Sequence, residues 1–145
     1  MSDNACPLPT DPDPDELAVI HRLLETTRNA IVGASDNPSK PSYRVASYLK
    51  KMGKEIIPIN PNHETVLGLK CYPALEQVPG TVELVDVFRR ADQCPPVVRS
   101  AIGKGAKAVW LQAGIKSDEA REVAREAGID YIEDRCLMVE HQAAL

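Results

Sequence analysis

The sequence predicts an α/β fold, a Rossmann-like three-layer α/β/α domain with a parallel sheet of about five strands. Short apolar runs begin near residues 29, 55, 83, 108 and 130, and each interval has room for one helix and two short connections. The runs are rich in β-branched residues, and segments with helical periodicity separate them. This alternation is typical of repeated βαβ units, in which helices cover both faces of a parallel sheet.

The composition fits an ordinary folded domain. The chain has 145 residues, of which 43% are hydrophobic and 26% charged, so a core can form without metal or disulfide staples. The net charge is −4 and no basic cluster is present, which argues against a nucleic-acid-binding protein. No apolar run approaches the roughly 18 residues that span a bilayer, so we expect no membrane contact.

Cysteine and histidine usage predicts a reducing compartment. The four cysteines, Cys6, Cys71, Cys94 and Cys136, are widely spaced and form no Cys-x-x-Cys motif, so we expect free thiols. The N-terminus lacks the basic and apolar segments of a signal peptide. The three histidines are scattered, which argues against a zinc site. We therefore expect a cytoplasmic protein without a metal centre.

The N-terminal residues predict a flexible arm, residues 1–14, ahead of a single domain, residues 15–145. Four of the twelve prolines fall within the arm, and proline removes backbone donors and blocks helix formation. A first helix is expected to begin near Asp15. Its apolar residues form one stripe: Leu17, Ile20, Leu23 and Leu24.

The later helices have recognisable ends. Residues 42–53 carry Val45, Tyr48, Leu49 and Met52 on one face and end at Gly53. The helix expected after residue 94 opens with two prolines, which a first turn tolerates. The next helix begins after Ser117, a capping residue, and ends at Gly128.

The loop after the first apolar run, GASDNPSKPSYRV, is the strongest candidate for a ligand site. In an open parallel sheet, ligands bind beyond the carboxyl ends of the strands, where the strand order reverses. Gly33 permits a positive φ and a close approach of the ligand, and Lys40 supplies a charge suited to phosphate. Ser35 and Ser39 offer hydroxyls, and Ser42 lies where the next helix presents unpaired N–H groups. A phosphate-bearing ligand fits this loop, although these residue types also form ordinary turns.

A dinucleotide such as NAD fits the loop less well. The second and third glycines of the G-x-G-x-x-G fingerprint are absent. The second apolar run ends in PINPN, residues 58–62, without the acidic residue that grips the ribose hydroxyls. A Walker A loop is excluded because no G-x-x-x-x-G-K-[ST] pattern occurs.

The stretch GASDNPSKPSYRVASYLKKMGKEIIPINP, residues 33–61, closely resembles the first βαβ unit of the small stand-alone coenzyme A-binding proteins. That family is related to the CoA-binding N-terminal domain of the succinyl-CoA synthetase α subunit. The resemblance continues through GLKCYPALEQVP, VDVFRR, AVWLQAG and IEDRCLMVEH, and it covers residues 17–142. It implies that the ligand is CoA or an acyl-CoA.

The resemblance also implies which residues hold CoA. The phosphates would be cradled by Gly33, Ala34, Ser35, Ser39, Lys40, Pro41 and Ser42. The adenosine would be flanked by Asn60 and Pro61, with the 3′-phosphate near Lys40 or Arg44. The opposite wall would be Val87, Phe88 and Arg89. The pantetheine arm would meet Gln112, Ala113 and Gly114, and its thiol end would lie near Cys136.

The resemblance implies a cofactor cradle without the phosphoryl-transfer apparatus of the synthetase. The sequence stops at residue 145, before a domain bearing a phosphorylated histidine, and it includes no ATP-grasp partner. We therefore expect non-catalytic binding of CoA and assign no catalytic residue. Cys136 has a second interpretation, as a small buried thiol that packs like an apolar residue. Two alternatives stay open: a component of a CoA-ligase-like enzyme that acts with a separate nucleotide-binding partner, and an NAD(P)-binding oxidoreductase. A protein partner or a homo-oligomer is left open too.

Overall fold

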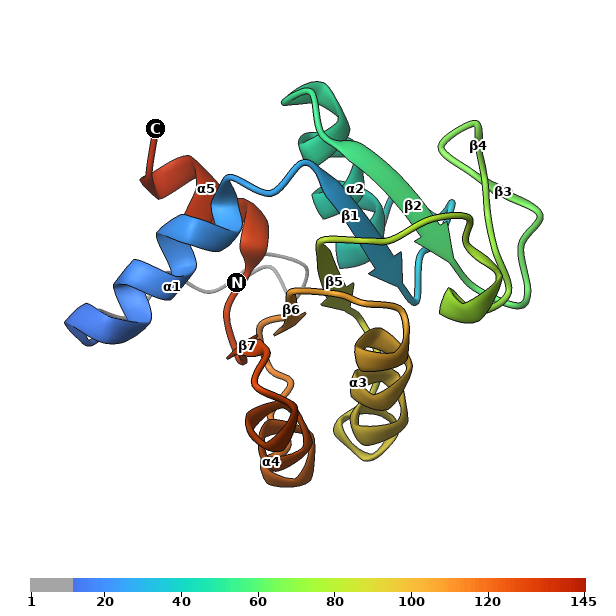
Figure 1. Ribbon diagram of the computed structural model, residues 1–145. Helices are drawn as coiled ribbons and strands as arrows, with labels where there is room; N and C mark the ends of the chain where they lie inside the picture. The colour runs from blue at the N-terminus through green and yellow to red at the C-terminus, as the bar shows by residue number, and fades with distance from the viewer. Residues whose placement is uncertain (1–11) are drawn as a thin grey trace.

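Five parallel strands form the central sheet (Figure 1). The computed structural model describes residues 12–145, so Cys6 and most of the predicted arm lie outside the described residues. The strands are β1 (Arg28–Val32), β2 (Glu55–Ile59), β5 (Leu84–Val87), β6 (Ala108–Leu111) and β7 (Asp130–Ile132), in the order β2-β1-β5-β6-β7. The order reverses between β1 and β5, which is the switch point where ligands bind in such sheets. The predicted Rossmann-like fold is confirmed.

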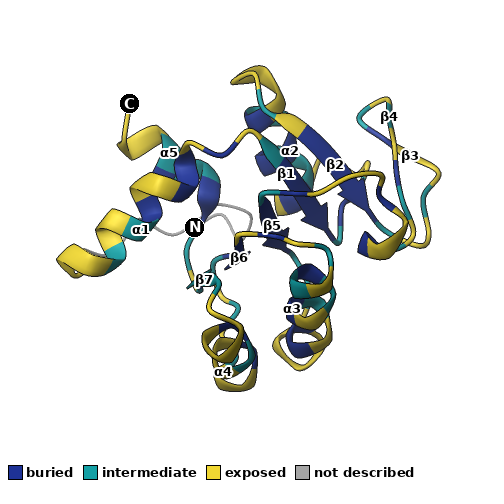
Figure 2. Cartoon of the chain, viewed as in Figure 1, coloured by how far each residue is buried: buried dark blue, intermediate teal, exposed yellow. Residues whose placement is uncertain are grey.

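Helices cover both faces of the sheet. The helices α1 (Pro14–Leu24), α2 (Pro41–Lys51) and α5 (Leu137–Ala143) pack on one face, and α3 (Cys94–Gly103) and α4 (Asp118–Ala127) pack on the other. Side chains along each strand alternate between the two cores: Ile31 and Leu84 face the first set of helices, and Val32 and Val85 face the second. Figure 2 shows the strands buried beneath the exposed outer faces of the helices. Burial on both faces explains why the strands are apolar at nearly every position.

Capping residues set the ends of α1 and α4, and those of α4, Ser117 and Gly128, are the ones that the sequence predicts. The carboxylate of Asp13 accepts a hydrogen bond from the Glu16 amide at 2.8 Å, so α1 starts one residue earlier than expected. The hydroxyl of Ser117 accepts from the Ala120 amide at 3.0 Å at the start of α4. Gly128 ends α4 with a φ of 74°, the left-handed conformation that glycine favours.

The core holds most, but not all, of the predicted apolar positions. Trp110 is fully buried, and its indole Nε1 donates to the Arg135 carbonyl at 2.8 Å. Leu17, in the first turn of α1, and Met52, the C-cap of α2, are 38% and 46% exposed. Among the described residues, no helix combines the length and apolar character needed to cross a membrane.

The chain between β2 and β5 contains an unpredicted hairpin. Strands β3 (Thr65–Val66) and β4 (Leu69–Lys70) pair antiparallel around Leu67 and Gly68, which both have positive φ. The chain then returns to the sheet, where Tyr72 pairs with Ile59 in an isolated parallel bridge. This pairing places residues 72–76, which run into the short 3-10 helix η1 (Leu75–Gln77), beside the carboxyl end of β2.

The loop after β1 touches the chain after β5 at Gly33. Gly33 has a φ of +86°, and a Cβ atom built there would lie 2.7 Å from the carbonyl oxygen of Phe88. The Gly33 amide donates to the Ile59 carbonyl at 3.0 Å, and the Phe88 amide donates to the Val32 carbonyl at 2.8 Å. Glycine is therefore required here both for its backbone conformation and for the space it leaves.

We expect Gly33→Ala to lower the free energy of unfolding more than Gly53→Ala does. Both glycines have a positive φ, which costs alanine about 1–2 kcal/mol, but Gly53 has no heavy atom within 4 Å of its built Cβ. The clash with Phe88 should cost Gly33→Ala a further ~1–3 kcal/mol. Urea denaturation of the two variants measures the difference. Equal losses would show that the close approach carries no energetic weight.

Candidate functional site

The carboxyl ends of the strands place four loops side by side along one edge. The loops follow β2, β1, β5 and β6 in that spatial order. Neighbouring strands lie ~4.8 Å apart, so the edge from Asn60 to Gln112 spans about 14 Å. An elongated ligand that lies across this edge meets every loop that the sequence predicts to bind CoA.

The predicted site residues differ in exposure. Five are buried: Ala34, Ser42, Val87, Gln112 and Cys136. Seven are half-buried: Gly33, Ser35, Arg44, Asn60, Phe88, Arg89 and Ala113. Five are exposed: Ser39, Lys40, Pro41, Pro61 and Gly114. Residues of the buried group offer a ligand little surface, whereas those of the other two groups are at least partly exposed at the edge.

Backbone and amide hydrogen bonds fasten the loop after β1 to the neighbouring loop after β2. The Asn60 Nδ2 donates to the Ala34 carbonyl at 2.8 Å, and the Asn60 Oδ1 accepts from the Asn62 amide at 2.9 Å. The Asp36 carboxylate accepts from the Leu67 amide at 2.8 Å, which ties the same loop to the hairpin. The side chain of Asn60 is therefore engaged in holding the two loops together.

The three serines of the loop have different capacities for an anion. The Ser35 hydroxyl accepts from the Asn37 amide at 3.0 Å and keeps its own proton to donate. The Ser39 hydroxyl donates to the Asn37 side chain at 2.8 Å, and its carbonyl accepts from Arg44 Nη1 at 3.4 Å. Ser42 is 4% exposed, so its contribution to an anion is the backbone N–H in the first turn of α2.

Two cations on these loops have no ion-pair partner among residues 12–145. Lys40 is exposed at the N-cap of α2, and its side chain makes no hydrogen bond there. Arg89 is half-buried after β5, and its guanidinium makes no hydrogen bond or ion pair within the described part of the chain. The next residue, Arg90, lies 3.5 Å from Asp92. Lys40 and Arg89 thus supply positive charge that the described structure leaves uncompensated.

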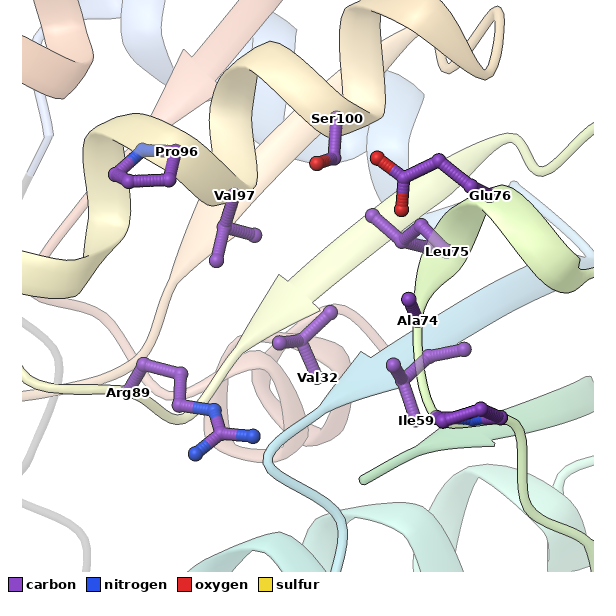
Figure 3. Close-up of a pocket in the computed structure, with 10 residues that line it drawn as sticks. Val32, Ile59, Ala74, Leu75, Glu76, Arg89, Pro96, Val97 and Ser100 are labelled. Carbon is purple, nitrogen blue, oxygen red and sulfur yellow. The ribbon is translucent and has the colours of Figure 1, made fainter. Parts of the chain in front are cut away.

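A pocket of about 190 Å³ opens at this edge on the α3 face of the sheet (Figure 3). Val32 and Ile59, the last residues of β1 and β2, form its base, and α3 and residues 73–76, which include the start of η1, form its walls. The full lining is Val32, Ile59, Pro73, Ala74, Leu75, Glu76, Arg89, Pro96, Val97 and Ser100. A volume below the roughly 300–1,000 Å³ of a drug-sized site suits one part of a larger ligand.

Sequence reasoning missed most of this lining. Residues 73–76 reach the pocket because Tyr72 pairs with the end of β2: its amide donates to the Pro58 carbonyl at 3.0 Å, and its carbonyl accepts from the Asn60 amide at 2.9 Å. The local sequence signal is weak: five residues lie between Pro73 and Pro79, and three of them are apolar. Its position depends on pairing with a distant strand, which no local pattern reveals.

At the far end of the edge, the loops after β6 and β7 meet the start of α5. The Gln112 Oε1 accepts from the Leu137 amide at 3.3 Å, and the Gly114 amide donates to the Asp134 carboxylate at 2.7 Å. Cys136 is the N-cap of α5 and is 3% exposed. The structure therefore brings the predicted pantetheine residues and Cys136 to one end of the edge, with the thiol below the surface. Among residues 12–145, no cluster of His, Cys, Asp and Glu is placed to hold a metal.

Comparison with known proteins identifies the family of the chain. Residues 27–142 match the family model described as the CoA binding domain. The chain belongs to the CoA-binding domain family. The resemblance that the sequence showed is confirmed at the level of the family.

Relatives of this CoA-binding domain occur at two very different lengths. The uncharacterised protein YneT of Bacillus subtilis is 34% identical over 129 residues, which cover 89% of this chain and 96% of YneT. The ADP-forming acetate–CoA ligase II of Archaeoglobus fulgidus is 33% identical over 105 residues, which cover 70% of this chain but 15% of the ligase.

Solved structures give the same division. A hypothetical protein from Pyrococcus horikoshii superposes with a TM-score of 0.87 and 36% identity, over 94% of this chain and 98% of that chain. The dinucleotide-forming acetyl-coenzyme A synthetase 1 of Candidatus Korarchaeum cryptofilum, in complex with phosphate and ADP, gives a TM-score of 0.69 and 27% identity. That match covers 79% of this chain and 27% of the synthetase.

Beneath the edge, β5 carries a fully buried carboxyl group, Asp86. Neither carboxyl oxygen has a hydrogen-bond partner among the described residues. The buried Nε2 of Gln112 has no partner among them either. Asp86 is in register with Trp110 on β6, so Gln112 lies diagonally across on the same face of the sheet. Burial raises the pKa of Asp86 well above its usual value, and the nearby Val87 amide only partly opposes the shift. Burial therefore favours the protonated form of Asp86 in the folded CoA-binding domain.

We expect Asp86→Asn to remove a pH dependence of stability. A carboxyl whose pKa is raised on folding contributes stability below its unfolded pKa of about 3.9, and this stability is lost as the pH rises through the folded pKa. The free energy of unfolding of the unmodified chain should therefore fall relative to that of Asp86→Asn as the pH rises above about 4, by up to ~1.4 kcal/mol per pH unit. Denaturant titrations at several pH values measure this, with the exposed Asp92→Asn as the control. A difference that stays constant with pH would contradict the raised pKa.

Proposed function

We propose that this chain binds coenzyme A or an acyl-CoA across the carboxyl edge of its sheet and does no chemistry of its own. The observation that carries the proposal is the combination, on one edge, of an apolar pocket and two cations without ion-pair partners in the described chain. Membership of the CoA-binding domain family supports CoA as the ligand that uses both features.

The residues present fit the parts of CoA. The adenine is planar and largely apolar, and it suits the pocket between β1, β2 and α3. The diphosphate suits the loop after β1, where Gly33 exposes the backbone, Lys40 supplies an ammonium and α2 begins. The pantetheine arm then extends along the edge toward Gln112 and Ala113, after β6. When bound, CoA supplies a thiol that carries acyl groups as thioesters.

The chain's own residues act by positioning in this proposal. Asn60 and Gly33 fix the loop after β1, so its amides are placed before the ligand arrives, which lowers the entropic cost of binding. The Ser35 hydroxyl has a proton left to donate to phosphate. Pro61 and Phe88 contribute apolar surface on either side. A non-catalytic role in sensing, storing or presenting CoA needs no further group.

The lengths of the relatives favour a domain that works alone. The alignment covers nearly all of YneT and nearly all of the Pyrococcus horikoshii protein, so chains of this extent occur without a long attached enzyme. This supports the stand-alone role, in which a second copy or another protein receives the bound CoA.

The second candidate is a component of a CoA ligase that acts with a separate nucleotide-binding partner. It is favoured by the 33% identity to an ADP-forming acetate–CoA ligase over 70% of this chain. In that role the edge would deliver CoA to a partner's active site. An oxidoreductase is not favoured, because Asn60 and Pro61 follow β2 where a ribose-binding carboxylate would stand.

We expect the purified chain to be stabilised by CoA more than by NAD or ATP, and to form no acetyl-CoA from acetate, ATP and CoA. A ligand at about 100 times its Kd that binds only the folded state adds ~2.7 kcal/mol of apparent stability. Thermal denaturation with each ligand and a thioester assay measure the two parts. Acetyl-CoA formation by the chain alone would overturn the non-catalytic role, and equal stabilisation by NAD would overturn the ligand assignment.

We expect Lys40→Ala to weaken CoA binding by more than about ten-fold, because a charge-assisted contact with the diphosphate is lost. Lys51→Ala is the matched control, since Lys51 is an exposed lysine at the other end of α2. Isothermal titration calorimetry measures both affinities. A loss of less than about two-fold would show that Lys40 does not contact the phosphates.

A further inference from the structure

We propose that Arg89 binds the 3′-phosphate of CoA and thereby lets the site distinguish CoA from dephospho-CoA. The inference rests on the proposed function, that CoA binds across this edge. It moves the 3′-phosphate away from Lys40 and Arg44, where the family resemblance places it, to a residue on the pocket wall.

Arg89 is the cation that belongs to the pocket. It follows β5 and shares the pocket lining with Val32 and Ile59. Figure 3 shows its side chain extending from the loop after β5 toward the end of β1, across the pocket from Glu76. Arg89 as a whole residue is half-buried, and its guanidinium makes no hydrogen bond or ion pair with residues 12–145. A charged group that loses hydration without gaining a partner is costly, so an anionic ligand is the expected compensation.

The other cations of the edge lie elsewhere. Lys40 is at the N-terminus of α2, and α2 packs on the face of the sheet opposite to α3 and the pocket. Arg44 lies within the first turns of α2 and donates back to the Ser39 carbonyl at 3.4 Å. Arg90 has a side chain 77% exposed and lies 3.5 Å from the Asp92 carboxylate. Of these four cations, only Arg89 lines the pocket.

The chemistry of CoA decides which phosphate meets Arg89. The 3′-phosphate is attached to the ribose that bears the adenine, whereas the diphosphate is attached at the 5′ carbon and leads away from the base. With adenine in the pocket, the ribose lies at its mouth, so a cation on the pocket wall meets the 3′-phosphate. The diphosphate continues across the edge to Lys40. Glu76 lies across the pocket, so the phosphate dianion favours the Arg89 side.

An arginine suits this role better than a lysine. Its planar guanidinium donates two parallel hydrogen bonds to phosphate oxygens, and it is less strongly hydrated than an ammonium group. Dephospho-CoA, NAD and ATP all lack a phosphate at the 3′ position of the adenosine ribose. A single guanidinium at the pocket would therefore select CoA against the commonest adenine nucleotides.

The test compares CoA and dephospho-CoA by isothermal titration calorimetry on the full chain and on Arg89→Met, Arg89→Lys and Arg90→Met. The unmodified chain should bind CoA at least about ten-fold more tightly than dephospho-CoA. Arg89→Met should bring this ratio close to one while leaving the affinity for dephospho-CoA within about three-fold. Arg89→Lys keeps the charge and should give an intermediate ratio, and Arg90→Met should keep the ratio of the unmodified chain.

The outcomes separate this inference from the proposed function. An Arg89→Met variant that loses both ligands by the same factor would overturn the role of Arg89 and leave CoA binding in place. A ratio near one in the unmodified chain would do the same. Failure of the unmodified chain to bind either ligand would overturn both proposals. If Arg89→Met fails to fold, Arg89→Lys provides the test. An affinity ratio of CoA to dephospho-CoA in Arg89→Lys equal to that of the unmodified chain would contradict a specific role of the guanidinium.

Discussion

The missing side chain at Gly33 is the constraint on which the whole edge depends. The chain after β5 approaches so closely that a Cβ atom would lie 2.7 Å from the Phe88 carbonyl oxygen. On the other side, the amides of Gly33 and Ala34 both donate to the Ile59 carbonyl, at 3.0 and 3.2 Å. The loop is thus fixed by both neighbouring strands, and the position of α2 and of Lys40 follows from it. Because this loop is already ordered before a ligand arrives, binding would cost less conformational entropy.

The regular elements could be predicted because their causes are local. Burial on both faces makes each strand apolar, and the capping residues Ser117 and Gly128 indicate the two ends of α4. The hairpin could not be predicted in this way, because strands of two residues show no periodicity. Its turn also places Leu67 at a φ of 54°, a conformation for which asparagine or glycine is the usual signal. The pocket walls were missed because they depend on the non-local pairing of Tyr72 with Ile59.

The site itself shows a different limit of sequence reasoning. The sequence supplies an inventory of donors and charges, but it does not reveal which of them the fold already uses. Asn60 and Ser39 are engaged in holding their own loops, and Ser42 is buried. Lys40 and Arg89 retain charge that no described residue compensates. Unused capacity, rather than residue type, is what singles out these two residues as candidate binding groups.

The two unused cations lie on opposite faces of the sheet, which has a consequence for any ligand that contacts both. Arg89 lines the pocket on the α3 face, and Lys40 begins α2 on the other face. Such a ligand must cross the edge between β1 and β5, and this is where Gly33 meets Phe88 with no side chain in the way. A larger residue there would both separate the strands and raise a barrier across the path. In the proposed mode of CoA binding, the same glycine would therefore serve both strand packing and the passage of the ligand, whether the domain works alone or within a longer ligase.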